Sequence, residues 1–319
     1  MRTLSVLLPT AALLLLLGAP AAHPADNGSW SVQPASGPSG ERPSLYLFAA
    51  PGTTLTDRVT VTNKTAEQLT LRLYAADAYN TPRDGGFAVR DRSEKQRSVG
   101  AWARTDRDTV TVGPKASVTV PLTITVPENA EPGDHPGALI ALDERVEATR
   151  RGSVAVGVRR AVGARIHLRV NGPTVPALSV EDIRIVRHRP LVPGTGTSRA
   201  VISYTLHNRG NVTLSPAVAL RAEGLFGRTL LERGLTRLPA ELLPRQRVRL
   251  TETWDGAPQL DRAEVELTAT AKGTRESAAV TFLAVPWLVA GLLAVLVAAG
   301  TARWARARRR RARTADRRP

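Results

Sequence analysis

The sequence predicts an all-β protein: two tandem Ig-like β-sandwich domains outside the membrane, followed by one C-terminal transmembrane helix. Three observations support this fold class. Short runs of alternating apolar and polar residues recur between residues 44 and 281, and turn-forming clusters such as PRDGG and HNRGN separate them. A long charge-free run then precedes an arginine-rich end. Alternation with period two indicates half-buried strands, and many short strands at regular spacing are typical of a sandwich.

The stretch ASVTVPLTITVP, residues 116–127, shows the alternation most clearly. Its even positions from Val118 to Val126 are apolar, whereas its odd positions are mostly polar. We therefore expect one strand with its even-numbered side chains in a core. Pro121 has no N–H for a ladder hydrogen bond, so it favours a position near a sheet edge.

Breaks in the strand-rich sequence divide the chain into domains. We predict a first sandwich at 44–172, a linker at 173–177 within the stretch NGPTVPA, and a second sandwich at 178–281. Residues 22–43 are rich in Gly, Ser and Pro and are expected to form a flexible leader. Both halves contain a strand, an Asn-bearing turn and another strand, in RVTVTNKTAEQLTLRL and in ISYTLHNRGNVTLSPAVAL. We therefore expect two sandwiches of one general kind.

The N-terminal residues have the pattern of a secretory signal peptide. An apolar run at 4–19 follows Arg2, and small residues at 19–21 fit the −3 and −1 positions of a cleavage site. We predict a signal peptide at 1–21 with cleavage near its end. The alternative, an uncleaved membrane helix, is disfavoured because the run is short and contains Pro9.

A second apolar run, FLAVPWLVAGLLAVLVAAGTA at 282–302, has 21 residues and no charge. As a helix it spans about 31 Å, close to the hydrocarbon thickness of a bilayer. Trp287 and Trp304 lie near its ends, where interfacial aromatic residues anchor spans. We predict a transmembrane helix at 282–302, with the arginine-rich tail at 303–319 in the cytoplasm and residues 22–281 outside. The chain is thus predicted to be a single-pass type I protein of the plasma membrane.

The last 17 residues carry nine arginines and one aspartate, a net +8 of the +16 on the whole chain. Next to a membrane span, such residues mark the cytoplasmic end and contact anionic lipid, at about 1 kcal/mol each near the surface. We therefore expect membrane lipid as the partner of the tail and no nucleic acid. The arginines assigned to lipid contact are Arg303, Arg306, Arg308, Arg309, Arg310, Arg311 and Arg313.

No residue pattern indicates catalysis or a bound cofactor. Cysteine is absent, which excludes disulfides, thiolate chemistry and Cys-based metal sites. No two of the five histidines have the spacing of a metal site, and neither GxSxG nor HExxH occurs. We therefore predict no enzyme activity, no cofactor and no metal, and we assign no catalytic residue.

The stretch EPGDHPGALIAL, residues 131–142, is the most suggestive of chemistry, because it places Asp134 beside His135. A turn followed by a strand accounts for it. Pro132-Gly133 fits the centre of a type II turn, in which glycine supplies the positive φ. The apolar run ALIAL then has the length of a buried strand. We interpret the acid and the histidine as structural.

The remaining site assignments concern aromatic residues. Trp102 and Trp254 adjoin predicted strands and are expected to anchor the two cores, as large buried aromatic side chains do. Gly133 is a third structural position, through its turn. Tyr79, in the loop-forming stretch DAYNTPRDGG, is our candidate for contact with a glycan or a protein partner, together with Asp77 at the start of that stretch.

The order of motifs in the first predicted sandwich resembles the WxL-interacting protein family. It runs YLFAAPGTTLTDRVTVTN, then AADAYNTPRDGGFAV, then VGAWARTDRDTVTVGPKASVTVPLTITVPENAEPGDHPGALIAL. The matching features are Asn63, Asp77 before Gly85-Gly86, Trp102, and the VP…PGDH…G run; they lie within residues 44–142. The resemblance implies a Gram-positive surface protein with a signal peptide, an Ig-like domain of the peptidoglycan-binding type, a second sandwich, one span and a basic tail.

We therefore expect a non-catalytic, membrane-anchored cell-surface protein. It would bind cell-wall polymer such as peptidoglycan, another surface protein, or both, through its Ig-like domains. Two alternatives stay open. One is an exported cell-wall-active enzyme with sandwiches as accessories, although no catalytic motif supports it. The other is an outer sensor subunit that acts with a separate cytoplasmic partner, because a 17-residue tail is too short to fold as a domain.

Overall fold

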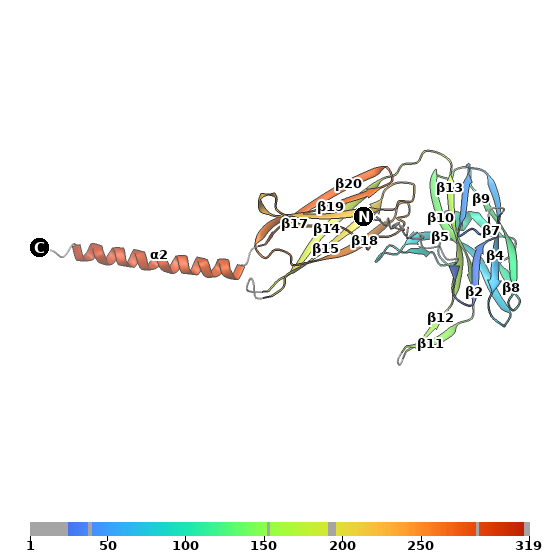
Figure 1. Ribbon diagram of the computed structural model, residues 1–319, viewed down its shortest axis with the longest axis horizontal. Helices are drawn as coiled ribbons and strands as arrows, with labels where there is room; N and C mark the ends of the chain where they lie inside the picture. The colour runs from blue at the N-terminus through green and yellow to red at the C-terminus, as the bar shows by residue number, and fades with distance from the viewer. Residues whose placement is uncertain (1–24, 38–39, 152–153, 191–195, 285–286, 316–319) are drawn as a thin grey trace, which may run out of the picture.

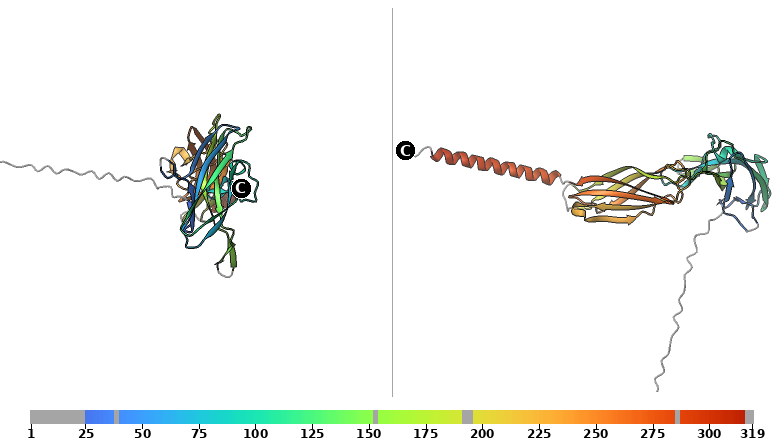
Figure 2. Two further views of the ribbon diagram at one scale, coloured as in Figure 1. Left: turned by 90° about the vertical axis from the view of Figure 1, so that its right-hand side faces the viewer. Right: turned by 90° about the horizontal axis from the view of Figure 1, so that it is seen from above.

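The computed structural model describes residues 25–37, 40–151, 154–190, 196–284 and 287–315. The predicted signal peptide at 1–21 lies outside the described residues. Within them, the chain is mostly strand and forms two β-sandwiches, with one long helix after the second (Figures 1 and 2). The strands of the first sandwich run across the direction of those of the second, one end of which meets the first. The prediction of an all-β protein built from sandwiches is confirmed.

Two facing sheets form the first sandwich. One has the strand order β1-β2-β4-β9-β7, and the other β3-β13-β10-β5-β6 with β8 beside β5. A short helix, α1 (Val99–Trp102), precedes β7, and the β11–β12 hairpin projects from the sandwich (Figure 1). The strands are β1 (Ala25–Asp26), β2 (Trp30–Pro34), β3 (Leu45–Ala49), β4 (Thr54–Asn63), β5 (Leu69–Asn80), β6 (Phe87–Val89), β7 (Ala103–Thr105), β8 (Thr109–Val112), β9 (Ser117–Thr125), β10 (Gly133–Leu142), β11 (Glu147–Arg151), β12 (Val154–Val158) and β13 (Ala161–Val170).

The alternation of the sequence builds the core of this sandwich. In β9, Val120, Leu122 and Ile124 are buried, whereas the residues between them are exposed or half-exposed. Strand β9 pairs with β4 along its whole length but with β7 only at 122–124. Pro121 therefore lies just outside the pairing with β7, in agreement with the expected position near an edge.

The second sandwich packs a three-stranded sheet, β14-β15-β18, against a four-stranded sheet, β17-β16-β19-β20. Its core is separate from the first and contains Tyr204 and Trp254. A single 3-10 turn, η1 (Leu225–Gly227), leads from β16 to β17. The strands are β14 (Leu178–His188), β15 (Arg199–Asn208), β16 (Ala217–Glu223), β17 (Thr229–Gly234), β18 (Arg247–Asp255), β19 (Asp261–Ala271) and β20 (Thr274–Ala284).

The two sandwiches share a fully buried asparagine at the end of an equivalent strand. Asn63 ends β4, and its side-chain amide donates to three backbone carbonyl oxygens at 2.6–3.1 Å. Asn208 ends β15 and donates to two carbonyl oxygens at 2.8 and 2.9 Å. Each amide ties its own turn to a neighbouring segment, and this bonding explains the strand–Asn turn–strand pattern that both halves of the sequence carry.

The expected flexible leader at 22–43 is wrong for the residues that form strands. Residues 30–34 are β2, which pairs with β4, and β1 extends the same sheet. Trp30 is only 1% exposed, and Val32 lies with it in the first core. This strand was not recognised in the sequence because only two of its side chains are apolar, too few to show an alternating pattern among the surrounding Gly, Ser and Pro residues. The first sandwich therefore begins before residue 44.

Helix α2 (Trp287–Ala315) follows the second sandwich. The predicted transmembrane helix at 282–302 is wrong at its start, because Phe282 belongs to β20 and packs against Trp254 with ring centroids 6.3 Å apart. The helix also continues past residue 302 through the arginine-rich stretch, since Ala and Arg both favour helix. Among the described residues, no helix is both long and apolar enough to span a membrane.

Candidate functional site: the cleft between the sandwiches

A cleft of about 460 Å³ lies where the two sandwiches meet. The first sandwich lines it with β5, with the segment around α1 and with the residues that lead into β10. The second sandwich lines it with two turns, around residues 211 and 244. The side chains that matter most for its chemistry are Arg90, Arg97, Trp102, His135, Asn211 and Arg245.

Asp77 lines the cleft, and its carboxylate oxygens already accept hydrogen bonds. Its buried carboxylate accepts hydrogen bonds from the backbone N–H groups of Arg97 at 2.5 Å and Gly100 at 2.8 Å. It also accepts one from Ser98 at 3.1 Å. The carboxylate therefore fixes the start of α1, which brings Trp102 to the cleft wall. Asp77 positions this wall instead of offering free oxygens to a ligand.

Tyr79 lies two residues further along β5 and is half-buried. The guanidinium of Arg90 lies 5.9 Å from the centroid of its ring. Arg90 and Ala78 line the cleft, whereas Tyr79 is not among the lining residues. Its proposed contact with a glycan or a partner stays a prediction, and any such contact would lie beside the cleft.

His135 points into the cleft, but neither of its ring nitrogens is free. Nε2 lies 2.8 Å from the carbonyl oxygen of Glu131, and Nδ1 lies 2.7 Å from Oγ of Ser98. Because a carbonyl oxygen only accepts, Nε2 carries the proton of the neutral ring, and Nδ1 accepts from the serine hydroxyl. The ring also packs on Trp102, with centroids 4.7 Å apart.

Asp134, the neighbouring acid, does not bond to His135. Its carboxylate makes a two-point ion pair with Arg169 at 2.6 and 3.0 Å. The same carboxylate accepts the backbone N–H of Thr213, in the second sandwich, at 2.7 Å. Asp134 and His135 are therefore no acid–histidine dyad: the first joins two domains and the second holds the cleft wall. Elsewhere in the described residues, no cluster of three or more His, Asp or Glu side chains could hold a metal ion.

Two asparagines bridge the sandwiches in opposite directions. Asn211 of the second sandwich donates from its side chain to the carbonyl oxygens of Pro132 at 2.8 Å and Pro173 at 2.9 Å. Asn80 of the first sandwich donates to the carbonyl oxygen of Glu241 at 2.7 Å and accepts the N–H of Leu243 at 2.8 Å. These contacts fix the relative position of the sandwiches, and with it the shape of the cleft.

Sequence reasoning missed both bridging asparagines. Asn211 stands in the turn HNRGN, which was interpreted only as a separator between strands. Asn80 stands in the loop-forming stretch around Tyr79. Their hydrogen-bond partners in the other sandwich lie 79 and 161 residues away in the chain. A local sequence pattern therefore does not predict these contacts.

The arginines that line the cleft differ in whether a carboxylate pairs with them. Arg90 pairs with Glu94 at 2.9 Å, and Arg245 pairs with Glu131 at 2.5 Å, both on exposed surface. The exposed side chain of Arg97 has no carboxylate partner within the described part of the chain. An unpaired guanidinium at the rim of a cleft favours an anionic group on an incoming ligand.

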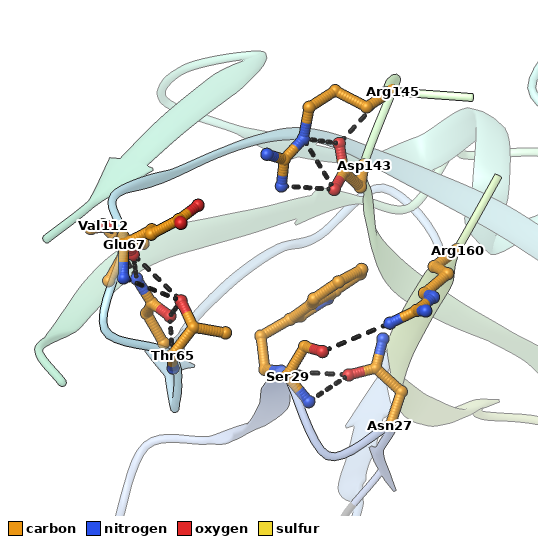
Figure 3. Close-up of polar contacts among 10 residues, drawn as sticks. Asn27, Ser29, Thr65, Glu67, Val112, Asp143, Arg145 and Arg160 are labelled. Carbon is orange, nitrogen blue, oxygen red and sulfur yellow. Dashed lines mark hydrogen bonds and ion pairs between the residues drawn. The ribbon is translucent and has the colours of Figure 1, made fainter. Parts of the chain in front are cut away.

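A second hollow, of about 270 Å³, lies in the first sandwich beside Trp30. Figure 3 shows polar contacts of its lining residues, Arg145 with Asp143 and Arg160 with Ser29. Asp143 lies at its rim and is held by Arg145, which donates through Nε at 3.0 Å and through a terminal nitrogen at 2.8 Å. These hydrogen bonds hold the pKa of Asp143 below its usual range. The indole N–H of Trp30 is buried, and no atom of the part of the chain that the structure describes accepts a hydrogen bond from it. Ser29, Thr65, Glu67, Leu69 and Arg160 complete the lining. We assign the hollow no function.

The other predicted site residues are distributed as follows. Trp254 is buried in the second core, and Trp102 is half-buried against the first core while it also lines the cleft. Trp304 is exposed, with the guanidinium of Arg308 5.5 Å from its ring centroid. Arg303 and Arg306 are exposed. The side chains of Trp287, Arg309, Arg310, Arg311 and Arg313 lie outside the described residues.

No protein-family model and no curated protein matches this chain. Among solved structures, it is similar to the class 5 fimbriae chaperone CfaA, at 13% identity and a TM-score of 0.36, over 80% of this chain and 100% of that one. It is also similar to a structure of a chaperone–tip adhesin complex of CFA/I fimbriae, at 12% identity and a TM-score of 0.37, over 81% and 99%. A third is the CsuC–CsuE complex of Acinetobacter baumannii, at 10% identity and a TM-score of 0.35, over 74% and 94%. Likeness at this level identifies no ligand, partner or activity for this chain.

Proposed function

We propose that this chain is a non-catalytic cell-surface protein that binds an anionic cell-wall polymer in the cleft between its sandwiches. The observation that carries the proposal is the unpaired guanidinium of Arg97 at the rim of a cleft that two sandwiches hold open. The resemblance of residues 44–142 to the WxL-interacting protein family supports a wall ligand such as peptidoglycan. A second surface protein is the alternative ligand.

The chemistry of the cleft supports binding and offers no catalytic pair. His135 has both nitrogens engaged, Asp134 is saturated by Arg169 and Thr213, and Asp77 is saturated by backbone N–H groups. A catalytic acid or base needs a free position within hydrogen-bond reach of its substrate. The side chains that remain available are a cation, an indole and half-exposed polar groups, which suit recognition.

We further propose that the protein is exported and anchored in the plasma membrane as a single-pass type I protein. The N-terminal apolar run and the nine arginines of the tail support this topology. Residues 287–302 of α2 carry no charge and would span about 24 Å as a helix. That length is somewhat below a typical hydrocarbon core, and the side chain of Arg303 would extend towards the lipid headgroups to compensate.

Co-sedimentation of the detergent-solubilised mature chain with purified wall sacculi tests the proposed function. We expect binding that weakens as salt rises from about 50 to 500 mM, because charge attraction between exposed groups is screened over that range. Arg97→Glu should reduce binding about tenfold or more, whereas the matched reversal Arg275→Glu, on exposed surface outside the cleft, should have a much smaller effect. Absence of binding at every salt concentration would reject the wall polymer and leave a protein partner.

A further inference from the structure

Strand β3 (Leu45–Ala49) forms one edge of its sheet. It pairs in parallel with β13, from Leu45 opposite Ile166 to Ala49 opposite Val170, and no strand of the described residues lies on its other side. The sequence around it, SLYLFAAPGT at 44–53, contains no charged residue. An exposed edge without charge can pair with another strand, and natural proteins usually prevent this.

Most of the other edges of the two sandwiches carry such protection; the four-residue edge β8, TVTV, is also uncharged and pairs only with β5 among the described residues. Strands β1, β6 and β7 have only two or three residues each. Strand β14 carries charged residues and a bulge after Glu181, and it lies beside β20. Strands β17 and β18 carry charged side chains, among them Arg233 and Arg247. Strand β3 has neither charge nor bulge.

The hydrogen bonds to β13 show which backbone groups of β3 are left over. The N–H of Asn171, directly after β13, donates to the carbonyl oxygen of Ala49 at 2.8 Å. Successive residues of a strand direct their N–H and C=O groups to opposite sides, so Leu45, Leu47 and Ala49 bond to β13. The N–H and C=O groups of Tyr46 and Phe48 therefore point to the free edge. In the described residues, β3 pairs with no strand other than β13, and no turn or loop hydrogen bond uses these groups.

The same two residues expose large aromatic side chains on the outer face of the sheet. Tyr46 is 62% and Phe48 66% exposed, while Leu47 between them packs against the core. The Tyr46 ring stacks flat on His167, with centroids 4.8 Å apart and an interplanar angle of 10°. Beside these rings lies a hollow of about 260 Å³, which leaves space for a further ring.

We propose that β3 pairs antiparallel with β3 of a second copy of this chain, about a twofold axis at Leu47. In this register Tyr46 stands opposite Phe48 of the second copy, and Leu47 stands opposite Leu47. The two Tyr46–Phe48 pairs are then hydrogen-bonded pairs, so all four free N–H and four free C=O groups of the two edges are satisfied by four hydrogen bonds. The register is self-complementary, as an isologous interface requires, and it buries the exposed rings against each other.

Because the chain has no cysteine, single cysteine substitutions in the full-length protein test this register directly. Two Leu47 residues at a non-hydrogen-bonded antiparallel position have Cα atoms about 4.5 Å apart, within the range of a disulfide. Two Tyr46 residues, or two Phe48 residues, lie on a diagonal about 8 Å apart, too far for one. Under mild oxidation of cells, Leu47→Cys should form a disulfide dimer at least tenfold faster than Tyr46→Cys or Phe48→Cys.

Equal rates for the three cysteine variants, or no dimer with Leu47→Cys, would overturn the proposal. A second measurement uses no cysteine variant, so a folding defect caused by a cysteine substitution cannot affect it. Sedimentation of the unmodified chain in detergent should show a concentration-dependent dimer, and Phe48→Lys should abolish it while the thermal midpoint stays near that of the wild type. A wild-type chain that sediments as a monomer at all concentrations would equally refute the pairing. Either result leaves the proposed wall binding, which uses the cleft, to be judged by its own assay.

Discussion

A Cβ atom at Gly133 would overlap the backbone carbonyl oxygen of Asn211, so the sandwiches can touch at this point only because residue 133 has no side chain. The N–H of Asp134 donates to that same carbonyl oxygen at 2.7 Å. Gly133 also has a φ of 122°, in the region that favours glycine. One residue thus serves both the backbone conformation with which β10 begins and the junction of the two domains.

Gly133→Ala should therefore destabilise the protein by about 1–3 kcal/mol through backbone strain alone, and by more through the overlap with Asn211. Thermal unfolding of the purified chain measures the effect. Gly234→Ala is the matched control, because a Cβ there meets nothing within 4 Å and its φ is not positive. An unchanged midpoint for Gly133→Ala would mean that the sandwiches do not approach as described.

Replacement of Asp77 should destabilise the cleft wall. Asp77→Ala leaves the backbone N–H groups of Arg97, Ser98 and Gly100 without their acceptor, at a cost of about 1–3 kcal/mol for a buried group. Hydrogen exchange should accelerate at residues 97–102 and remain unchanged in the second sandwich. Asp108→Ala, at an exposed carboxylate, is the control. Wild-type exchange in the Asp77 variant would argue against its positioning role.

The strands and the separate cores were predictable because alternation with period two needs only local sequence. The pattern of β9 predicted which of its side chains are buried, and the buried Asn63 and Asn208 explain why the two halves look alike. The strand β2 was not predictable, because it carries only Trp30 and Val32 as apolar signal among Gly, Ser and Pro.

The cleft between the sandwiches could not be predicted from the sequence. Its wall depends on contacts between residues such as Asp134 and Thr213, which are 79 positions apart. The motif around Asp134 looked suggestive because an acid stood next to a histidine, but adjacent residues of a strand point to opposite faces. That rule separates Asp134 and His135 once β10 is known to begin at Gly133. Packing between the two sandwiches decides which side of the first sandwich the second contacts. This packing cannot be predicted from a single sequence.

Two buried carboxylates should make the fold sensitive to acid. The side chain of Arg145 lowers the pKa of Asp143, and the backbone N–H of Leu225, assisted by Arg228, lowers that of Asp261. In each case the folded pKa lies below the unfolded value near 3.8. The stabilisation is therefore complete well above that value and is lost as pH falls through the folded pKa. We expect a steady thermal midpoint between about pH 5 and pH 7 and a decline below about pH 4.

Substitution of each of these two aspartates by asparagine tests whether their carboxylates cause the acid sensitivity. Asp143→Asn and Asp261→Asn should each lower the midpoint at pH 7 and flatten its decline in acid, while Asp108→Asn, at an exposed position, should change neither. A decline as steep in both variants as in the wild type would place the acid sensitivity in other groups.

The hydroxyl of Tyr204 is buried in the second core and has no hydrogen-bond partner among the described residues. Burial raises the pKa of this phenol well above its usual range. An unsatisfied buried hydroxyl costs about 1–3 kcal/mol, so its removal in Tyr204→Phe should leave the protein equally stable or more stable. Thermal unfolding tests this, with Tyr46→Phe as an exposed control that should be neutral. A clear loss of stability in Tyr204→Phe would show that the hydroxyl has a partner.

Protease treatment of intact protoplasts tests the proposed type I topology. The arginines after residue 302 favour the cytoplasmic side, and the N-terminal apolar run favours export of the sandwiches. Trypsin added from outside should therefore degrade the sandwiches, whose many exposed arginines include Arg97 and Arg275, and spare an epitope placed after residue 319. Permeabilised protoplasts are the control, since trypsin should then also remove the epitope by cleavage within the arginine-rich tail. Protection of residues 22–281 in intact protoplasts would reject the topology, and with it the assignment of the cleft to a ligand outside the membrane.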